Sequence, residues 1–352
     1  MKNALRLVVP LIAVAGLLAG CSTVGSSVAP STKMTHAATA PAPGVRPTLT
    51  SEKPAKKIKI AIIAIENNPF FAQVKTGYTA VAAKVKAAGG QVDWINAGTN
   101  VTDDTVGNAI NAATAQGYSA IASLMPDNGI CNYIKKATAA GVIVAAYNGD
   151  ATCAQKSGAV FFHGQDLYAA GVEAGTLMCK ATASLASQSK PGKVGVLTES
   201  FTFQALEERR LGFLAGLKKD CPWVTPVSQG VQYGSATDVL ASSTRNYMTS
   251  TPSLVGIYVT GGNPNIAAAT VGTAGKASTV KVIGFDFTAE NVAQIKAGSM
   301  YAAIGQDPFG QSYDTVAWLY NAVVAHKLPS PKYFIPTQLV VGTKDNIDSV
   351  AK

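Results

Sequence analysis

The chain has 352 residues, with 29 lysines and arginines against 20 acidic residues and a formal net charge of +9. The basic residues are scattered and form no run longer than pairs such as Lys56–Lys57 and Lys218–Lys219. This pattern argues against nucleic-acid recognition and bears instead on solubility and attraction to membrane surfaces.

The first 21 residues have the pattern of an export signal. Lys2 and Arg6 are followed by an apolar stretch and then by the tetrad Leu-Ala-Gly-Cys that ends at Cys21. This order of charged, apolar and small residues predicts a secretory signal peptide over residues 1–20. The tetrad resembles a bacterial lipobox, so we expect Cys21 to carry a lipid, the alternative being an ordinary signal peptide with an incidental cysteine.

The next segment, residues 21–57, is rich in Ser, Thr, Ala and Pro and shows no apolar periodicity. Such a composition predicts a flexible tether that holds the folded part away from a membrane. About 295 residues follow this segment, enough for two domains of ordinary size.

Strands and helices alternate through the rest of the chain. The run Ile58–Ile65 is apolar and β-branched, as expected for a buried parallel strand, and Asn68 with Pro69 then predicts the start of a helix. Two successive series of this kind, the second beginning near Asp166, predict an α/β protein with two doubly wound, mostly parallel sheets. The predicted strands are 58–65, 91–95, 119–124, 142–147, 159–163, 193–198, 224–228, 254–260, 281–285, 301–305 and 337–341.

Ligands of doubly wound sheets bind outside the carboxyl ends of the strands, so the residues directly after each strand are the candidate site. These residues are amides, carboxylates, aromatic rings and glycines, a set that suits a hydroxyl-rich ligand because each hydroxyl needs hydrogen-bonding partners and each C–H face an apolar surface. They are Glu66, Asn67, Asn68, Phe70, Phe71, Asn148, Asp150, Glu199, Phe201, Gly261, Gly262, Asn263, Asp286, Gln306 and Asp307.

Catalytic motifs are absent from the sequence. It contains no G-x-S-x-G, H-E-x-x-H, P-loop or G-x-G-x-x-G pattern, and His163, the only plausible catalytic histidine, has no evident nucleophile as a partner. We therefore expect no enzymatic activity and no cofactor, and we interpret His163 as a structural residue near a hinge.

Four cysteines follow Cys21, namely Cys131, Cys153, Cys179 and Cys221. An even number in an exported chain suggests disulfides, with three possible pairings. Free thiols, or a metal site with His163, are the alternatives, but the spacings match no zinc motif and we expect no metal.

Several stretches together resemble the periplasmic binding proteins of the ribose and simple-sugar class. They are ENNPFF (66–71), GQDLYAAG (164–171), ERRLGF (208–213), VIGFDFT (282–288) and YAAIGQDP (301–308), and the resemblance covers nearly the whole chain from Lys57. It implies two Rossmann-like domains joined by three crossovers, with residues 58–164 and 307–336 in the first domain and 165–306 and 337–352 in the second. It also implies a monomer outside the cytoplasm that captures a sugar and delivers it to the permease of an ABC transporter, with no nucleic-acid partner.

The resemblance also implies roles for individual residues. Asn68 would bond a sugar hydroxyl as well as cap its helix, while Phe70 and Phe71 would pack on the sugar ring. Asp286 and Gln306 would accept and donate hydrogen bonds, and Tyr233 would supply a ring from the second domain. The complete predicted set is Asn68, Phe70, Phe71, Tyr147, Asn148, Glu207, Tyr233, Asn263, Asp286 and Gln306.

The sequence departs from the ribose-binding pattern where Tyr147, Asn148 and Glu207 stand in place of an aspartate and two arginines. Losing two guanidinium groups argues against ribose itself. An amino- or deoxy-sugar, a polyol, another cationic solute or a signalling ligand such as autoinducer-2 then remain as alternatives. The implied fold further suggests the disulfide pairing Cys131–Cys153 and Cys179–Cys221.

Overall fold

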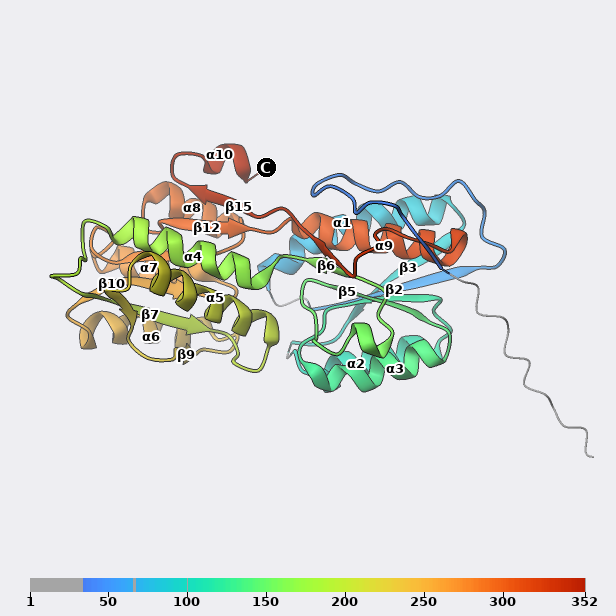
Figure 1. Ribbon diagram of the computed structural model, residues 1–352, viewed down its shortest axis with the longest axis horizontal. Helices are drawn as coiled ribbons and strands as arrows, with labels where there is room; N and C mark the ends of the chain where they lie inside the picture. The colour runs from blue at the N-terminus through green and yellow to red at the C-terminus, as the bar shows by residue number, and fades with distance from the viewer. Residues whose placement is uncertain (1–33, 66–67, 100, 352) are drawn as a thin grey trace, which may run out of the picture. The chain divides into compact units, whose positions relative to one another are not determined.

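The computed structural model describes residues 34–65, 68–99 and 101–351, which contain two large sheets, each flanked by helices, and a small two-stranded sheet (Figure 1). The six-stranded sheet has the order β14-β6-β5-β4-β2-β3, and all of its strand pairs are parallel. We call this sheet and its helices the N-domain. Its elements are β1 (Thr35–His36), β2 (Ile58–Ala64), α1 (Pro69–Ala87), β3 (Gly90–Asn96), α2 (Asp103–Ala115), β4 (Ala120–Ser123), η1 (Asn128–Ile130), α3 (Cys131–Ala139), β5 (Ile143–Tyr147), η2 (Gln155–Ser157), β6 (Phe162–Gly164), α9 (Pro308–Ala325), β13 (Lys327–Leu328) and β14 (Phe334–Pro336).

The second sheet has the order β15-β12-β11-β10-β7-β8, with β9 also pairing with β7. Its strand pairs are parallel except for β12 with β15, which is antiparallel. We call this sheet and its helices the C-domain. Its elements are α4 (Leu167–Thr182), β7 (Gly192–Thr198), α5 (Gln204–Asp220), β8 (Val224–Pro226), β9 (Val231–Gln232), α6 (Thr237–Ser250), β10 (Leu254–Val259), α7 (Pro264–Thr273), β11 (Lys281–Phe285), α8 (Ala289–Ala297), β12 (Ala302–Gly305), β15 (Val340–Thr343) and α10 (Ile347–Val350).

The chain passes between the two sheets three times, after β6, after β12 and after β14. The crossovers are hydrogen-bonded to one another. The side-chain amide of Gln165 donates to the carbonyl oxygen of Gly305 over 3.2 Å, and the backbone amide of Thr337 donates to Gly164 over 2.8 Å. We refer to these adjacent crossovers as the hinge.

Continuous apolar strands explain why each sheet is covered on both faces. Strand β2 reads IKIAIIA and its residues are buried except for Lys59, so it cannot lie at a solvated surface. Helices α1 and α9 pack together on one face of the N-domain sheet, where α9 also contacts β2, β4 and β5. In the C-domain, α4 and α5 form the most extensive helix pair of the described chain.

Glycines bring α4 and α5 into close contact. A Cβ atom added at Gly171 would lie 2.2 Å from the carbonyl oxygen of Arg209, and one at Gly212 would lie 2.2 Å from that of Tyr168. Gly175 and Gly216 repeat this reciprocal arrangement one turn further on. Only glycine allows two helices to approach this closely, so the position of α5, and with it Arg209, is fixed by backbone contact.

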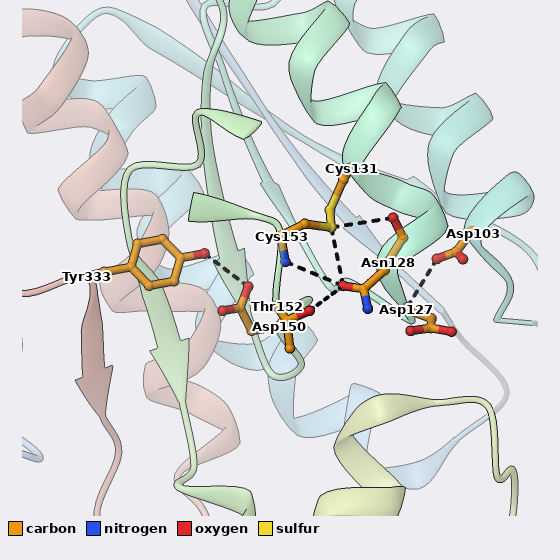
Figure 2. The surroundings of a disulfide bond; sticks show 8 residues. All are labelled: Asp103, Asp127, Asn128, Cys131, Asp150, Thr152, Cys153 and Tyr333. Atoms are coloured by element: carbon orange, nitrogen blue, oxygen red, sulfur yellow. Dashed lines mark hydrogen bonds between the residues drawn. A yellow bond between two sulfur atoms is a disulfide. The ribbon is translucent and has the colours of Figure 1, made fainter. Parts of the chain in front are cut away.

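Two disulfides join Cys131 with Cys153 and Cys179 with Cys221, the pairing that the sequence predicted. The first joins the start of α3 to the loop after β5, where Thr152 donates to the side chain of Asn128 over 2.7 Å (Figure 2). The second joins the end of α4 to the end of α5. With sequence separations of 22 and 42, loop entropy gives each bond about 3 to 4 kcal/mol of stabilisation.

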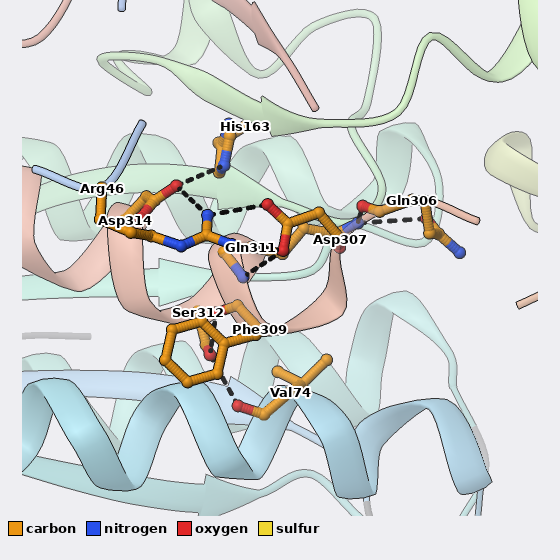
Figure 3. A network of polar contacts seen from close by, with 10 residues as sticks. Arg46, Val74, His163, Gln306, Asp307, Phe309, Gln311, Ser312 and Asp314 are labelled. Carbon is orange, nitrogen blue, oxygen red and sulfur yellow. Dashed lines mark hydrogen bonds and ion pairs between the residues drawn. The ribbon is translucent and has the colours of Figure 1, made fainter. Parts of the chain in front are cut away.

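The expectation of a flexible tether extending to residue 57 is wrong for residues Met34–Lys57, which we call the strap. Strand β1 pairs with β13, and Asn321 of α9 bonds the backbone of both Thr48 and Thr50. Arg46 bonds both carboxylate oxygens of Asp307 over 2.7 Å (Figure 3). The strap therefore has the composition of a linker, although its polar groups have specific hydrogen-bonding partners. The predicted signal peptide and Cys21 lie outside the described residues.

Candidate functional site

A cavity of about 350 Å³ lies at the carboxyl ends of strands from both sheets. Its lining comes from the ends of strands and the loops and helix starts that follow β2, β3, β5, β7, β9, β10, β11 and β12, as expected for doubly wound sheets. The lining residues are Ile65, Asn68, Phe70, Phe71, Thr99, Val101, Thr102, Asn148, Glu199, Ser200, Thr202, Phe203, Leu206, Arg209, Gln232, Gly234, Ser235, Gly261, Gly262, Asn263, Asp286 and Gln306.

Three polar lining residues have left-handed backbone conformations. Asn148, Asn263 and Asp286 follow β5, β10 and β11, with φ values of 65°, 61° and 71°. Asn and Asp enter this region at lower cost than other side-chain-bearing residues, yet each such residue still stores strain. The strain turns the chain sharply at the strand ends and brings these side chains to the cavity.

The N-domain wall carries amides and aromatic rings. Asn68 caps α1, since its Oδ1 atom accepts a hydrogen bond from the backbone amide of Phe70 over 2.9 Å. Its Nδ2 atom points to the opposite wall, where a Cβ atom added at Gly262 would lie 2.8 Å away. Phe70 and Phe71 pack edge to face with 5.2 Å between ring centroids. The described residues of this wall offer hydrogen-bonding groups and an apolar surface without charge.

The C-domain wall carries three charged side chains, Glu199, Arg209 and Asp286. The guanidinium of Arg209 lies 3.7 Å from the centroid of the Phe285 ring. It donates to the carbonyl oxygen of Thr260 over 3.1 Å and to Oε1 of Gln165 over 2.8 Å, whereas its Nε atom is buried without a partner. Arg209 is therefore fixed in place, with a donor group left over.

Burial and the nearby Asp286 together raise the pKa of Glu199 to about 7, against the opposing effects of the Gly262 amide and Arg209. Burial likewise raises the pKa of Asp286, while Arg209 and a hydrogen bond from Gln306 oppose that shift. Near neutral pH the Glu199 side chain therefore exists in both protonation states and can accept or donate a hydrogen bond.

The cavity residues are hydrogen-bonded to the hinge. The side-chain amide of Gln306 donates to Oδ1 of Asp286 over 2.7 Å. Gln311 of α9 in turn donates to Oε1 of Gln306 over 3.1 Å (Figure 3). Arg209 reaches the same hinge through Gln165. Two of the three charged cavity residues thus have direct partners on crossovers between the domains.

The sequence matches the family model described as periplasmic binding protein domain over residues 60–327. The chain belongs to this family. It is therefore a solute-binding protein of the periplasmic or extracytoplasmic type. A search of curated proteins gives no match.

Solved structures of related solute-binding proteins share the fold. One from Burkholderia graminis, in complex with D-arabinose, is 25% identical with a TM-score of 0.74, covering 85% of this chain and all of its own. One from Acidothermus cellulolyticus, with myo-inositol, is 24% identical with a TM-score of 0.71, covering 84% of this chain and 97% of its own. One from Agrobacterium vitis, with α-D-tagatopyranose, is 22% identical with a TM-score of 0.72 and has the same coverage.

Most of the residues that the family resemblance singled out meet at the cavity. Those lining it are Asn68, Phe70, Phe71, Asn148, Asn263, Asp286 and Gln306. Tyr147, Glu207 and Tyr233 do not line it. Tyr147 is fully buried beneath the N-domain wall, where its hydroxyl donates to the carbonyl oxygen of Ile63. The hydroxyl of Tyr233 donates to Gly262, so this residue supports the loop of the wall from behind.

Glu207 forms a two-point ion pair with Arg210 on the same helix, one turn away. The charged residue of α5 that lines the cavity is Arg209, two positions later. One guanidinium is therefore present at the cavity, where the sequence analysis inferred the loss of two. Arg209, Glu199 and Phe203 are among the cavity residues that the predicted set omitted. The stretch ERRLGF contained the signal for Arg209, and Glu199 directly follows a strand.

His163 lies on β6 beside the hinge and away from the cavity lining. Its Nδ1 atom is 2.9 Å from the carbonyl oxygen of Ile335, and its Nε2 atom is 3.6 Å from a carboxylate oxygen of Asp314. The ring also packs edge to face on Trp318. These contacts give His163 a structural place between β6, β14 and α9.

Proposed function

We propose that this solute-binding protein captures an uncharged simple sugar or polyol in the cavity and delivers it to the permease of an ABC transporter. One observation carries the proposal: amide, carboxylate and guanidinium groups of both domains meet in one cavity beside Phe70, Phe71 and Phe203. A ring with several hydroxyls satisfies such a set, because each hydroxyl both donates and accepts while the C–H face packs on an aromatic ring.

The related structures support this ligand class. D-Arabinose, α-D-tagatopyranose and myo-inositol, named with three of them, are all uncharged and carry hydroxyl groups around a small skeleton. The common chemistry is therefore a polyhydroxylated ligand of monosaccharide size. We do not assign ribose, since Asn148 replaces an arginine of that pattern.

Ligand binding would favour a closed arrangement of the domains because the ligand contacts both walls at once. Asp286 and Arg209 would then connect the ligand to the hinge through Gln306 and Gln165. The closed form would dock on the permease. Export through residues 1–20 and lipidation of Cys21 would hold the monomeric protein at the outer side of a bacterial membrane.

A ligand screen tests the proposal. Thermal shifts and calorimetry with D-arabinose, D-tagatose, D-glucose, D-ribose, myo-inositol and autoinducer-2 should give a rise in melting temperature for one or more neutral sugars or polyols. The proposal fails if none of the sugars, nor myo-inositol, shifts the melting temperature while an amino acid, nucleoside or autoinducer-2 does.

A second candidate is an amino-sugar or another cationic polar solute. Glu199 and Asp286 are two carboxyl groups on one wall, and the cation nearest to them, Arg209, is already bonded to Gln165 and Thr260. Matched titrations with D-glucose and D-glucosamine, and with D-galactose and D-galactosamine, separate the candidates. Tighter binding of the amines that weakens as Glu199 is protonated would favour this second candidate over neutral sugars.

A further inference from the structure

The strands of the N-domain sheet all begin at one edge because they are parallel. Helices α1, α3 and α9 pack on this sheet and run antiparallel to its strands. The carboxyl ends of these helices therefore lie at the edge where the strands begin. We call this edge the basal face. The cavity lies at the other edge, where the strands end.

Exposed lysines gather on the basal face. Lys53, Lys56 and Lys57 come directly before β2, and Lys84 and Lys86 lie in the last turn of α1.

Further exposed lysines reach the same edge from other elements. Lys135 and Lys136 lie near the end of α3, and Lys156 lies in η2, which packs against α3. Lys327 follows α9, and Lys332 comes just before β14. Within the described residues, none of these basal lysines has a carboxylate within the 4.0 Å of an ion pair. The basal face is therefore a positively charged surface whose lysines are not neutralised by ion pairs with described residues.

Acidic residues of the N-domain lie mainly at the opposite edge. Asp103 and Asp104 begin α2, Asp127 follows β4, and Asp150 follows β5. Asp307 begins α9 and is bonded by Arg46.

The basal face itself carries Glu52 and Asp93 among its described residues, and Asp93 already accepts hydrogen bonds from Tyr118 and Gln91. The positive charges of this domain thus gather at the basal edge of the sheet, and most of its negative charges lie at the opposite edge.

Helix dipoles explain only part of the pattern. Lysines near the carboxyl end of a helix complement its negative end, which accounts for Lys84, Lys86 and the pair in α3. Lys53, Lys56 and Lys57 precede a strand instead, so no helix end accounts for them.

The chain enters the described region at the same face. Strand β1 pairs with β13, with Thr35 opposite Lys327, directly after the end of α9. Between Cys21 and Thr35 the chain has only 14 residue steps, which span at most about 50 Å when fully extended. A protein anchored through Cys21 would therefore keep its basal face within that distance of the lipid.

We propose that the basal face binds anionic lipid headgroups and so turns this end of the N-domain toward the membrane. Each lysine close to an anionic surface contributes about 1 kcal/mol, and the attraction falls off over about 8 Å at physiological salt. The proposal concerns the surface of the folded domain and holds independently of which solute occupies the cavity.

Vesicle sedimentation tests the proposal with the chain from Ser22 onward, which keeps every described residue and lacks the cysteine predicted to carry lipid. The protein should bind vesicles of 70% phosphatidylcholine and 30% phosphatidylglycerol, and not pure phosphatidylcholine. Replacing Lys53, Lys56, Lys57 and Lys86 by Glu should weaken binding at least about tenfold.

The matched control replaces Lys180, Lys190, Lys218 and Lys276 by Glu. These lysines are exposed on the C-domain, and the change in net charge is the same. Binding of this variant should change less than about twofold.

Equal weakening by the two variants, or equal binding to both kinds of vesicle, overturns the proposal. So does an absence of vesicle binding, which would leave an acidic protein surface as the partner of the basal lysines. Unchanged circular dichroism and melting temperatures establish that both variants are folded.

Discussion

The N-domain wall of the cavity presents Asn68, Asn148 and two phenylalanine rings, whereas the C-domain wall presents Glu199, Arg209 and Asp286. The neutral wall is built on one helix start and one strained turn. The charged wall needs more support, because a buried charge is costly unless it has partners. The closely packed helices α4 and α5 and the hinge glutamines supply that support. The difference suggests that the N-domain shapes the ligand site while the C-domain contributes most of the binding energy.

The largest effect is expected from Arg209→Met. The side chain of Arg209 is buried, and its loss removes the nearby positive charge that opposes the raised pKa values of Glu199 and Asp286. Unfolding free energy measured with urea should fall by about 3 to 5 kcal/mol. Arg245→Met on the exposed face of α6 is the control and should change it by less than about 0.5 kcal/mol. Similar losses in both variants would contradict a supporting role for Arg209.

A pair of variants compares the two walls directly. In the variant Asp286→Asn, the asparagine tolerates a φ near 71° and can still accept a hydrogen bond from Gln306. The substitution therefore removes the charge with little change in the fold. Affinity for the sugar should fall about 10- to 100-fold. Asn148→Gly, which also accepts a positive φ, should cost less than about tenfold. Calorimetry that ranks the two losses in the reverse order would refute the assignment of most binding energy to the C-domain.

Gly212→Ala tests how the charged wall is held. The added methyl group would meet the carbonyl oxygen of Tyr168, so α4 and α5 must separate and α5 must shift with Arg209. The free energy of unfolding should fall by about 1 to 3 kcal/mol, and sugar affinity should fall with it. Leu211→Ala changes the neighbouring exposed residue and is the control. An unchanged affinity would show that Arg209 does not depend on this helix contact.

The smallest effect concerns the protonation of Glu199. Its pKa of about 7 in the folded chain lies above the usual value near 4.3, so the folded state binds the proton more tightly than the unfolded state between these values. Stability from this group is therefore present at low pH and is lost as pH rises through about 7. Glu199→Gln should be more stable than the natural chain by about 1 to 2 kcal/mol at pH 8, with little difference at pH 4. Glu290→Gln, an exposed control on α8, should show no such dependence.

The alternation of strands and helices was sufficient to predict both sheets and the edge at which the cavity lies. Individual side chains were harder to place, because their direction depends on turns that local patterns do not define. Tyr147 ends β5 and points to the core, whereas the left-handed turn at Asn148 brings the next side chain to the cavity. Along α5, a difference of two positions separates Glu207, which pairs with Arg210, from Arg209 in the cavity.

The strap shows a different limit of sequence reasoning. Its composition of Pro, Thr and Ala resembles that of a linker, and its partners lie more than 250 positions away in the chain. Such contacts leave no local periodicity. Asp307, which caps α9, and Asp314, two turns further along the helix, both bond Arg46 of the strap, and this pairing becomes evident only in the folded chain.

The path of the strap also defines where the cooperative folding unit begins. A chain shortened to begin at Ile58, the first strand of the sheet, would lose Arg46 and leave Asp307 and Asp314 without their cation. It would also uncover the part of α9 around Asn321. Burial by itself raises the pKa of Asp307, and the bonds from Arg46 and the Gly310 amide outweigh it, so this truncation would remove the largest interaction that lowers the pKa of this hinge residue. Limited proteolysis should accordingly spare residues 34–57, and soluble versions for ligand sensing should start before Met34.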